Sequence, residues 1–301
     1  MLDWIKKIIT SWRQRTGSPT LGLALGGGGV RGLAHIGVLT VLEREVIPLN
    51  AIAGTSMGAI VAASYALNRE FDSRRLTEQA TRLSTIVPVL SRTVGKGQDT
   101  ILDRLRLFAD IERFLFDSVW GWGSLQEVSV KESLAELTMG KDLQEGKIPV
   151  AVVATDLLSG EKVVFNDGPA AIALQASAAI PGFFPPVLYQ ERLLADGGFI
   201  ELVPASVARQ MGVRFVIAVD VDQEDLRVEV NNGLQAVLRA LDIASRHQKQ
   251  HHLDVADLVI RPEFGEAVDT LDFSKAELCI RAGVRAAERS LPDIRRLLTG
   301  S

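Results

Sequence analysis

Short apolar runs alternate along the chain with longer stretches in which apolar residues recur at helical spacing. The runs predict buried strands, and the periodic stretches predict helices that cover them. Strands are expected at residues 21–25, from 51 to a turn at 54–58, and at 150–155, 163–165, 193–195, 215–221 and 256–260; helices are expected at 33–44, after the turn at 54–58, at 232–252 and at 276–298. Because several strands are apolar throughout and alternate with helices, we expect a three-layer α/β/α sandwich with a mainly parallel central sheet.

No internal repeat or linker divides the chain. We therefore expect one catalytic domain at residues 21–262, with a helical, lid-like region at about 73–148, and a C-terminal helix within 263–301 that packs on the same domain. Residues 1–20 differ, because their apolar residues recur at helical spacing among four basic residues and one acidic residue. This composition is typical of a helix that lies in a membrane interface. A helix docked on the protein's own surface is the alternative.

The bulk composition narrows the class of protein. The 301 residues are enough to bury a large core, and the formal net charge of −4 argues against a general nucleic-acid binder. One cysteine, Cys279, excludes an intrachain disulfide and fits a reducing compartment. No apolar run approaches the ~20 residues that a membrane span needs, and lysines interrupt the first apolar stretch before it could form a secretory signal. We expect a cytoplasmic protein, with residues 1–20 as a candidate peripheral contact with the inner membrane.

Residues 54–58 read Gly-Thr-Ser-Met-Gly and lie between a predicted strand and a predicted helix. A serine between two glycines at such a turn is typical of a nucleophile elbow, in which only small neighbours permit the strained backbone. The N-terminus of the following helix favours developing negative charge near Ser56. The alternative is an ordinary glycine turn in which the serine caps the helix.

Residues 26–29 are four consecutive glycines between the first strand and the first helix. Such a run costs backbone entropy, and it is expected where backbone N–H groups must approach a ligand closely. The spacing of Gly27, Gly29 and Gly32 also fits a dinucleotide-binding turn, but that turn expects an acidic residue at the end of the second strand, where this chain has residues 54–58. No Gly-Lys-Ser/Thr follows the glycines, which disfavours a phosphate-loop NTPase.

A nucleophilic serine needs a base, and one candidate is Asp196 in the Asp-Gly-Gly turn at 196–198, which follows a predicted strand. Aspartate is a weaker base than histidine by about 2.6 pKa units, or roughly 3.5 kcal/mol. The site would compensate by burying the carboxylate against the apolar loop that contains Ile180, Phe183 and Phe184, and by strong oxyanion stabilisation. A β-turn aspartate that binds its own backbone is the alternative.

Four histidines offer a second solution. His247, His251 and His252 follow Asp196 in the chain, so the order Ser, Asp, His of a triad is available, although these three stand in a polar stretch that predicts a solvated helix end. His35 falls in the helix after the glycines and is typical of a packed core histidine. The residues alone leave the dyad and the triad open.

Together, four local patterns in this order resemble the patatin-like phospholipase family. They are the glycine loop at 27–32, the serine turn at 54–58, the Ala-Ser-Ala-Ala-Ile-Pro-x-x-Phe-Pro-Pro block at 176–186 and Asp-Gly-Gly at 196–198. The resemblance covers residues 21–222 and implies a three-layer fold with lipid acyl hydrolysis by a Ser-Asp dyad. It identifies the nucleophile as Ser56, the base as Asp196, the oxyanion loop as Gly27, Gly28, Gly29 and Arg31, and the glycines that support the two turns as Gly54, Gly58, Gly197 and Gly198.

We therefore expect a serine esterase that acts on acyl esters of lipids, such as phospholipid or lysophospholipid, at a membrane surface and through an acyl-enzyme. The alternatives are an acyltransferase that uses the same acyl-enzyme and a non-enzymatic lipid-binding protein. We expect no metal, because no His or Cys cluster has the spacing of metal ligands, and no other cofactor. The dyad requires that Ser56 and Asp196 meet in the fold beside the glycine amides.

Overall fold

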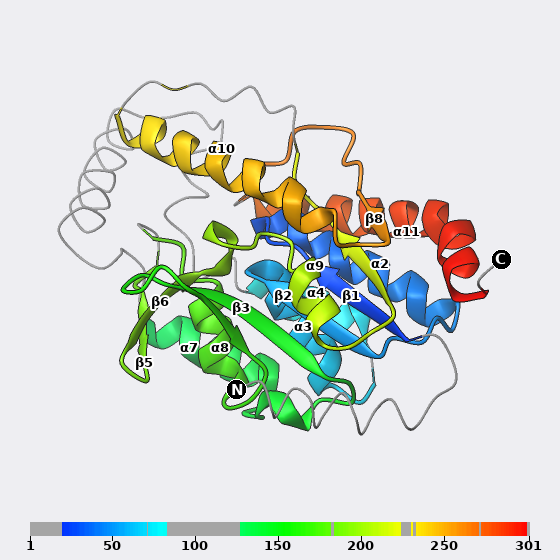
Figure 1. Cartoon of the computed structure of the whole chain (residues 1–301), viewed down its shortest axis with the longest axis horizontal. Helices are drawn as coiled ribbons and strands as arrows, with labels where there is room; N and C mark the ends of the chain where they lie inside the picture. The colour runs from blue at the N-terminus through cyan, green and yellow to red at the C-terminus, as the bar shows by residue number, and fades with distance from the viewer. Residues whose placement is uncertain are drawn as a thin grey trace.

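The computed structural model describes residues 20–70, 72–82, 127–181, 184–223, 230, 233–270 and 272–299. These residues form a sheet of eight strands in the order β5-β6-β3-β2-β1-β7-β8, with β4 paired to β3 beside this path (Figure 1). In chain order the strands are β1 Leu21–Leu25, β2 Ala51–Thr55, β3 Val150–Asp156, β4 Lys162–Phe165, β5 Val187–Tyr189, β6 Arg192–Asp196, β7 Phe215–Val219 and β8 Leu258–Ile260.

The centre of the sheet is parallel. β1 pairs in parallel with β2 and β7, β2 with β3, and β7 with β8. The edge of the sheet that contains β5 is antiparallel, because β4 and β6 both pair antiparallel with β3, and β5 pairs antiparallel with β6. The mainly parallel sheet expected from the apolar runs is therefore confirmed, and the short strand β5 is an element that the pattern did not predict.

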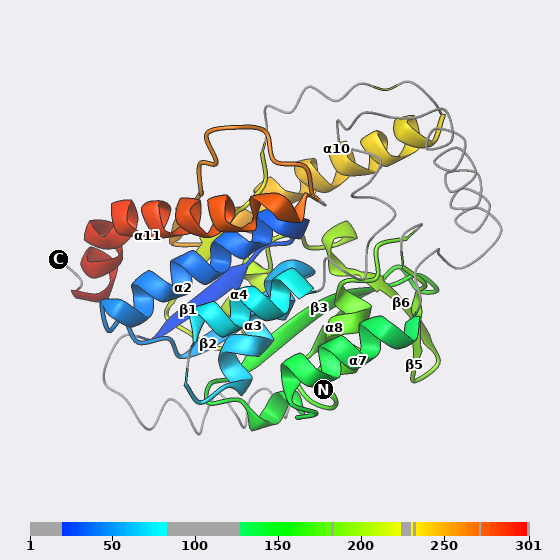
Figure 2. The same ribbon diagram turned by 180° about the vertical axis from the view of Figure 1, so that it is seen from behind.

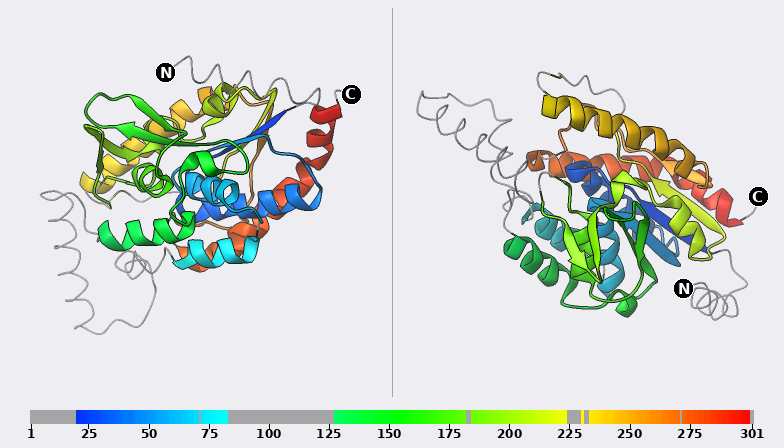
Figure 3. Two further views of the ribbon diagram at one scale, coloured as in Figure 1. Left: turned by 90° about the horizontal axis from the view of Figure 1, so that it is seen from below. Right: turned by 60° about the vertical axis from the view of Figure 1, so that its left-hand side comes forward.

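Helices cover both faces of this sheet. They are α2 Ala34–Arg44, α3 Met57–Leu67, α4 Ser73–Arg82, α7 Glu127–Thr138, α8 Ala170–Ser177, α9 Ala205–Gln210, α10 Gly233–Leu253 and α11 Ala276–Thr299, with a 3-10 turn at Gly29–Leu33 ahead of α2. Helices α9 and α10 lie on the face seen in Figure 1, and α2, α3, α4, α7, α8 and α11 lie on the face seen in Figure 2. The left panel of Figure 3 shows the sheet between these two layers, which confirms the three-layer α/β/α arrangement.

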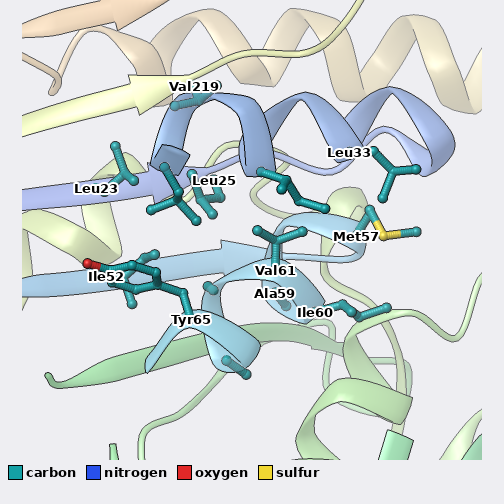
Figure 4. Close-up of a cluster of buried hydrophobic side chains, with 14 of the residues drawn as sticks. Leu23, Leu25, Leu33, Ile52, Met57, Ala59, Ile60, Val61, Tyr65 and Val219 are labelled. Atoms are coloured by element: carbon teal, nitrogen blue, oxygen red, sulfur yellow. The ribbon is translucent and has the colours of Figure 1, made fainter. Parts of the chain in front are cut away.

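Each face of the sheet has its own hydrophobic core. Side chains alternate along a strand, so Leu23 and Leu25 of β1 point to one face and Ala24 points to the other. On the first face they meet Ile52 of β2 and Val61 of α3, and all four side chains are buried (Figure 4). This packing fixes α3 against the ends of β1 and β2.

The last helix, α11, packs closely on α2 through two glycines. A Cβ on Gly37 of α2 would overlap the carbonyl oxygen of Ile280, and one on Gly283 of α11 would overlap the carbonyl oxygen of Ala34. Only residues without a side chain permit this approach of the two backbones. Helix α11 therefore holds α2, the helix that follows the glycine loop.

Some sequence predictions fall on residues that the structure does not describe. Residues 1–19 and 83–126 are outside the described ranges, so the N-terminal membrane helix and most of the lid-like region stay predictions. Helices α4 and α7 occupy the described parts of the region at 73–148. Among the described helices, none combines the length and the apolar character that crossing a bilayer requires.

Candidate active site

Ser56 forms a sharp turn between β2 and α3. Its backbone angles are φ 55° and ψ −125°, a positive-φ conformation that costs free energy for a residue with a side chain. The neighbouring glycines make the turn possible, because a Cβ on Gly54 would overlap the carbonyl oxygen of Gly58, and one on Gly58 would overlap that of Leu25. The five residues 54–58 therefore have the geometry of a nucleophile elbow.

Ser177 holds this turn from the end of α8. The backbone N–H of Ser56 donates to the Ser177 hydroxyl at 2.9 Å, and that hydroxyl donates to the carbonyl oxygen of Val153 at 2.6 Å. The Ser177 side chain is fully buried. In the sequence, the place of Ser177 in the block at 176–186 was the only indication that it belongs to the site.

Strand β3 lies between the strand that ends before Ser56 and the strand that ends at Asp196. Thr55 at the end of β2 pairs with Val153 of β3, and the next residue of β3, Ala154, pairs with Asp196 at the end of β6. The two strand ends thus flank β3 at the same end of the sheet. An interaction with the Ser56 side chain lowers the pKa of the Asp196 carboxylate, so the structure places these two predicted residues side by side.

The Asp196 carboxylate is buried, with 5% of the residue exposed. Burial raises its pKa from 3.8 to about 6, and hydrogen bonds from the Ser56 side chain and the Gly198 N–H oppose this rise. The Gly198 N–H lies 2.7 Å from Oδ1. Gly197 is packed so closely that a Cβ would overlap the carbonyl oxygen of Val153. The carboxylate is therefore a stronger base than an aspartate in water. Phe183, expected among its apolar neighbours, lies outside the described residues.

The glycine loop passes directly beside the nucleophile, since a Cβ on Gly27 would lie 3.2 Å from that of Ser56. The Gly27 N–H donates to the carbonyl oxygen of Leu202 at 2.9 Å, so this amide is already engaged. For Gly28 and Gly29, no hydrogen-bond acceptor of the N–H lies within the described residues. The amide donors that the predicted oxyanion loop can offer to a ligand are thus narrowed to Gly28 and Gly29.

The Arg31 side chain contacts the glycine loop and two neighbouring residues. Its side chain is buried, Nε donates to the carbonyl oxygen of Gly28 at 3.4 Å, and Nη2 donates to Oγ1 of Thr270 at 3.4 Å. Its Nη1 lies 3.6 Å from Oδ1 of Asp222. These contacts indicate that Arg31 fixes the position of the glycine loop.

None of the four histidines is among the groups that shift the pKa of Asp196. His35 is fully buried, and its Nε2 lies 2.7 Å from the carbonyl oxygen of Gly26. Burial lowers the pKa of His35 to about 4, so the ring is neutral near pH 7 and donates to the glycine loop. The remaining histidines lie on α10, and the hydrogen bonds that shift the pKa of Asp196 come from Ser56 and Gly198. The described geometry thus favours the dyad over a triad.

This arrangement combines a hydroxyl on a strained turn, a buried carboxylate with a raised pKa and two amides open to a ligand. Such a set can perform acyl transfer through a covalent intermediate. Within the described ranges, no three His, Cys, Asp or Glu side chains are grouped to hold a metal ion.

Comparisons with known proteins indicate the family to which the chain is related. A family model described as patatin-like phospholipase matches residues 23–209. An uncharacterized NTE family protein of Mycobacterium tuberculosis is 33% identical over 205 residues, which cover 68% of this chain and 50% of the relative. Patatin-like phospholipase domain-containing protein 6 of Homo sapiens is 32% identical over 209 residues, covering 68% of this chain and 14% of the relative.

A fungal relative from Scheffersomyces stipitis, named lysophospholipase NTE1, is 27% identical over 213 residues, covering 71% of this chain and 12% of the relative. The chain therefore spans half or less of the length of these curated relatives. Among solved structures, VipD from Legionella pneumophila aligns with a TM-score of 0.49 at 13% identity, covering 95% of this chain and 67% of that chain. Ser56 and Asp196 both lie inside the matched range, whereas β7, α10 and α11 lie beyond it.

Proposed function

Since the chain belongs to the patatin-like phospholipase family, we propose that it hydrolyses acyl esters of lipids, with phospholipids or lysophospholipids as the substrate class. The names of the human and fungal relatives state phospholipase and lysophospholipase, which supports this class. The observation that carries the proposal is the contact between the Ser56 side chain and the buried Asp196 carboxylate, beside two open glycine amides.

In the first half-reaction the Oγ of Ser56 attacks the ester carbonyl carbon, and the proton of the hydroxyl passes to Asp196. The negative charge on the carbonyl oxygen is stabilised by the N–H groups of Gly28 and Gly29 and by the N-terminus of α3. When the C–O bond breaks, Asp196 returns the proton to the leaving alcohol oxygen. The acyl group then remains on Ser56.

In the second half-reaction a water molecule attacks the acyl-enzyme. Asp196 accepts a proton from this water, and the second tetrahedral oxyanion occupies the same amides. Collapse releases the fatty acid and returns the proton to the Oγ of Ser56. One ester and one water are thus converted to one acid and one alcohol.

The test of this proposal is covalent labelling with a fluorophosphonate over a range of pH. Labelling is expected at Ser56, and its rate should rise with pH and level off above a midpoint near 6, because only the deprotonated Asp196 can accept the proton. Intact-mass and peptide mapping locate the label, and the rate is followed by quenching at fixed times. Labelling of another residue, or a rate at Ser56 that does not change between pH 5 and 8, would contradict the dyad.

A smaller effect is expected from Ser177→Ala. Without the Ser177 hydroxyl, the backbone N–H of Ser56 loses its acceptor, and the elbow can shift from the position that serves catalysis. We expect kcat for a short-chain chromogenic ester to fall about 10-fold, which corresponds to ~1.4 kcal/mol, with KM little changed.

The matched control is Ser64→Ala in α3. The Ser64 hydroxyl is also buried, but it has no hydrogen-bond partner among the described residues, so its removal should leave kcat unchanged. Equal kcat values for Ser177→Ala and the unmodified protein would show that the bond to Ser56 has no part in turnover.

A further inference from the structure

The Arg31 side chain, which holds the glycine loop, forms an ion pair with Asp222, a residue far from the loop in the sequence. Asp222 follows β7, and its two carboxylate oxygens face two different cations. Oδ1 lies 3.6 Å from Nη1 of Arg31, and Oδ2 lies 3.0 Å from Nζ of Lys249 on α10. A continuous path of ion pairs therefore joins α10 to the glycine loop.

This path is buried along its length. The side chains of Arg31, Asp222 and Lys249 are 8%, 6% and 4% exposed. Lys249 also lies 3.1 Å from Asp220, which is 3% exposed, so two buried carboxylates surround one buried ammonium group. Removing one partner of a buried ion pair is strongly unfavourable, because the other charge stays in a region of low dielectric. The positions of these side chains are thus tightly linked.

The geometry of a peptide bond transmits this link to the oxyanion donors. Arg31 binds the carbonyl oxygen of Gly28, and the N–H of Gly29 belongs to the same planar peptide unit. In a trans peptide the C=O and N–H groups point in opposite directions. A carbonyl held toward Arg31 therefore directs the Gly29 N–H away from Arg31, and rotation of this peptide would remove the donor from its place.

We propose that Lys249 is a positioning residue for the oxyanion loop, acting through Asp222 and Arg31 on the peptide between Gly28 and Gly29. This inference rests on the proposed function, since the loop needs a fixed donor only if an oxyanion forms. Asp222 and Lys249 lie beyond residue 209, where the match to the family model ends. The orientation of the loop thus depends on a segment that the family match does not cover.

The first test is Lys249→Met, which keeps most of the unbranched apolar part of the side chain but removes the charge. We expect kcat for a short-chain p-nitrophenyl ester to fall about 10-fold or more with KM within twofold, because the donor acts mainly in the transition state. The matching thiono ester should be affected much less, since sulfur is a weak hydrogen-bond acceptor. A ratio of oxygen-ester to thiono-ester turnover that falls several-fold supports the proposal. An unchanged ratio would overturn it.

The second test does not depend on turnover. Hydrogen exchange followed by mass spectrometry, on peptides that span residues 26–33, should show faster exchange in Lys249→Met than in the unmodified protein. Lys249→Arg, which can still pair with both carboxylates, should restore slow exchange and most of kcat. Unchanged exchange of this loop in Lys249→Met would also overturn the proposal. Absence of ester turnover in the unmodified protein would instead contradict the proposed function, and the exchange result would stand independently.

Arg209→Met is the matched control. Arg209 pairs with Asp257, which also accepts the N–H of Val216, so this variant likewise leaves a carboxylate without its cation. Arg209 belongs to α9 and takes no part in the ion pairs of the loop. We expect some loss of stability with unchanged kcat, unchanged thiono ratio and unchanged exchange at residues 26–33. The same changes in both variants would show a general loss of structure and overturn the specific role of Lys249.

Discussion

Asp196→Asn is expected to abolish ester turnover and, at the same time, to make the folded protein more stable at neutral pH. An amide oxygen can still accept the Gly198 N–H, so the turn is preserved, but it cannot accept the proton of Ser56. General-base catalysis contributes about 10²- to 10⁴-fold, and we expect a loss of kcat in this range or larger.

The stability change follows from the raised pKa of Asp196. The folded protein has a pKa of about 6, above the usual 3.8, so the folded state binds this proton more tightly than the unfolded state. The resulting stabilisation is complete below pH 4 and is lost as the pH rises through 6. Above pH 6 the buried charge costs up to about 3 kcal/mol, which asparagine avoids. Urea unfolding at pH 5 and pH 7.5 should therefore show a larger gain for the variant at pH 7.5.

Asp156→Asn provides a control of the opposite sign. The N–H of Leu158 binds the Asp156 carboxylate and holds its pKa below the usual value, so its charged form stabilises the fold at neutral pH. This variant should lose stability at pH 7.5 and keep its turnover. A loss of stability in Asp196→Asn at pH 7.5, like that in Asp156→Asn, would show that burial does not dominate at Asp196.

Ser56→Gly and Ser56→Ala are both expected to remove turnover, but with different effects on stability. Neither side chain can form an acyl-enzyme, so residual activity should be below 10⁻³ of the unmodified protein, on the order expected for loss of a nucleophile. Glycine adopts φ 55° without strain, whereas alanine does not. We expect Ser56→Gly to be more stable than Ser56→Ala by about 1–2 kcal/mol in urea unfolding.

The same pair of substitutions at Ser64 provides the comparison. Ser64 lies inside α3, where glycine is less favourable than alanine by about 1 kcal/mol. The order of stability should therefore reverse between the two sites. If alanine is the more stable replacement at Ser56 as well, the elbow stores no strain. Substantial turnover in both Ser56 variants would identify a different nucleophile.

Much of the fold followed from local patterns in the sequence. Apolar runs are sufficient to locate buried strands such as β1 and β7, because a strand covered on both faces has no polar side. The short edge strand β5 is different, since it has only three residues and Leu188 within it is exposed. Its pairing with β6 depends on contacts across the chain, and no local signal predicted it.

Some features of the candidate site could be predicted from the sequence, and others could not. The glycine and serine turns were recognisable because their backbone geometry restricts which residues can occupy them, as at Gly54 and Gly58. The engagement of the Gly27 amide could not be predicted, because its acceptor is a carbonyl oxygen 175 positions away, at Leu202. Lys249 lies in a polar stretch that predicted a solvated helix end, and only the tertiary structure places it between buried carboxylates.

The sheet order also determines how the chain could be shortened. β1, which leads into the glycine loop, is flanked by β2 on one side and by β7 on the other, and β7 begins at Phe215. A fragment limited to residues 23–209 would lack β7 and leave the backbone groups along one side of β1 unpaired, a template for aggregation. A shortened chain should therefore keep β7 and the final helix in addition to the portion that matches the family model.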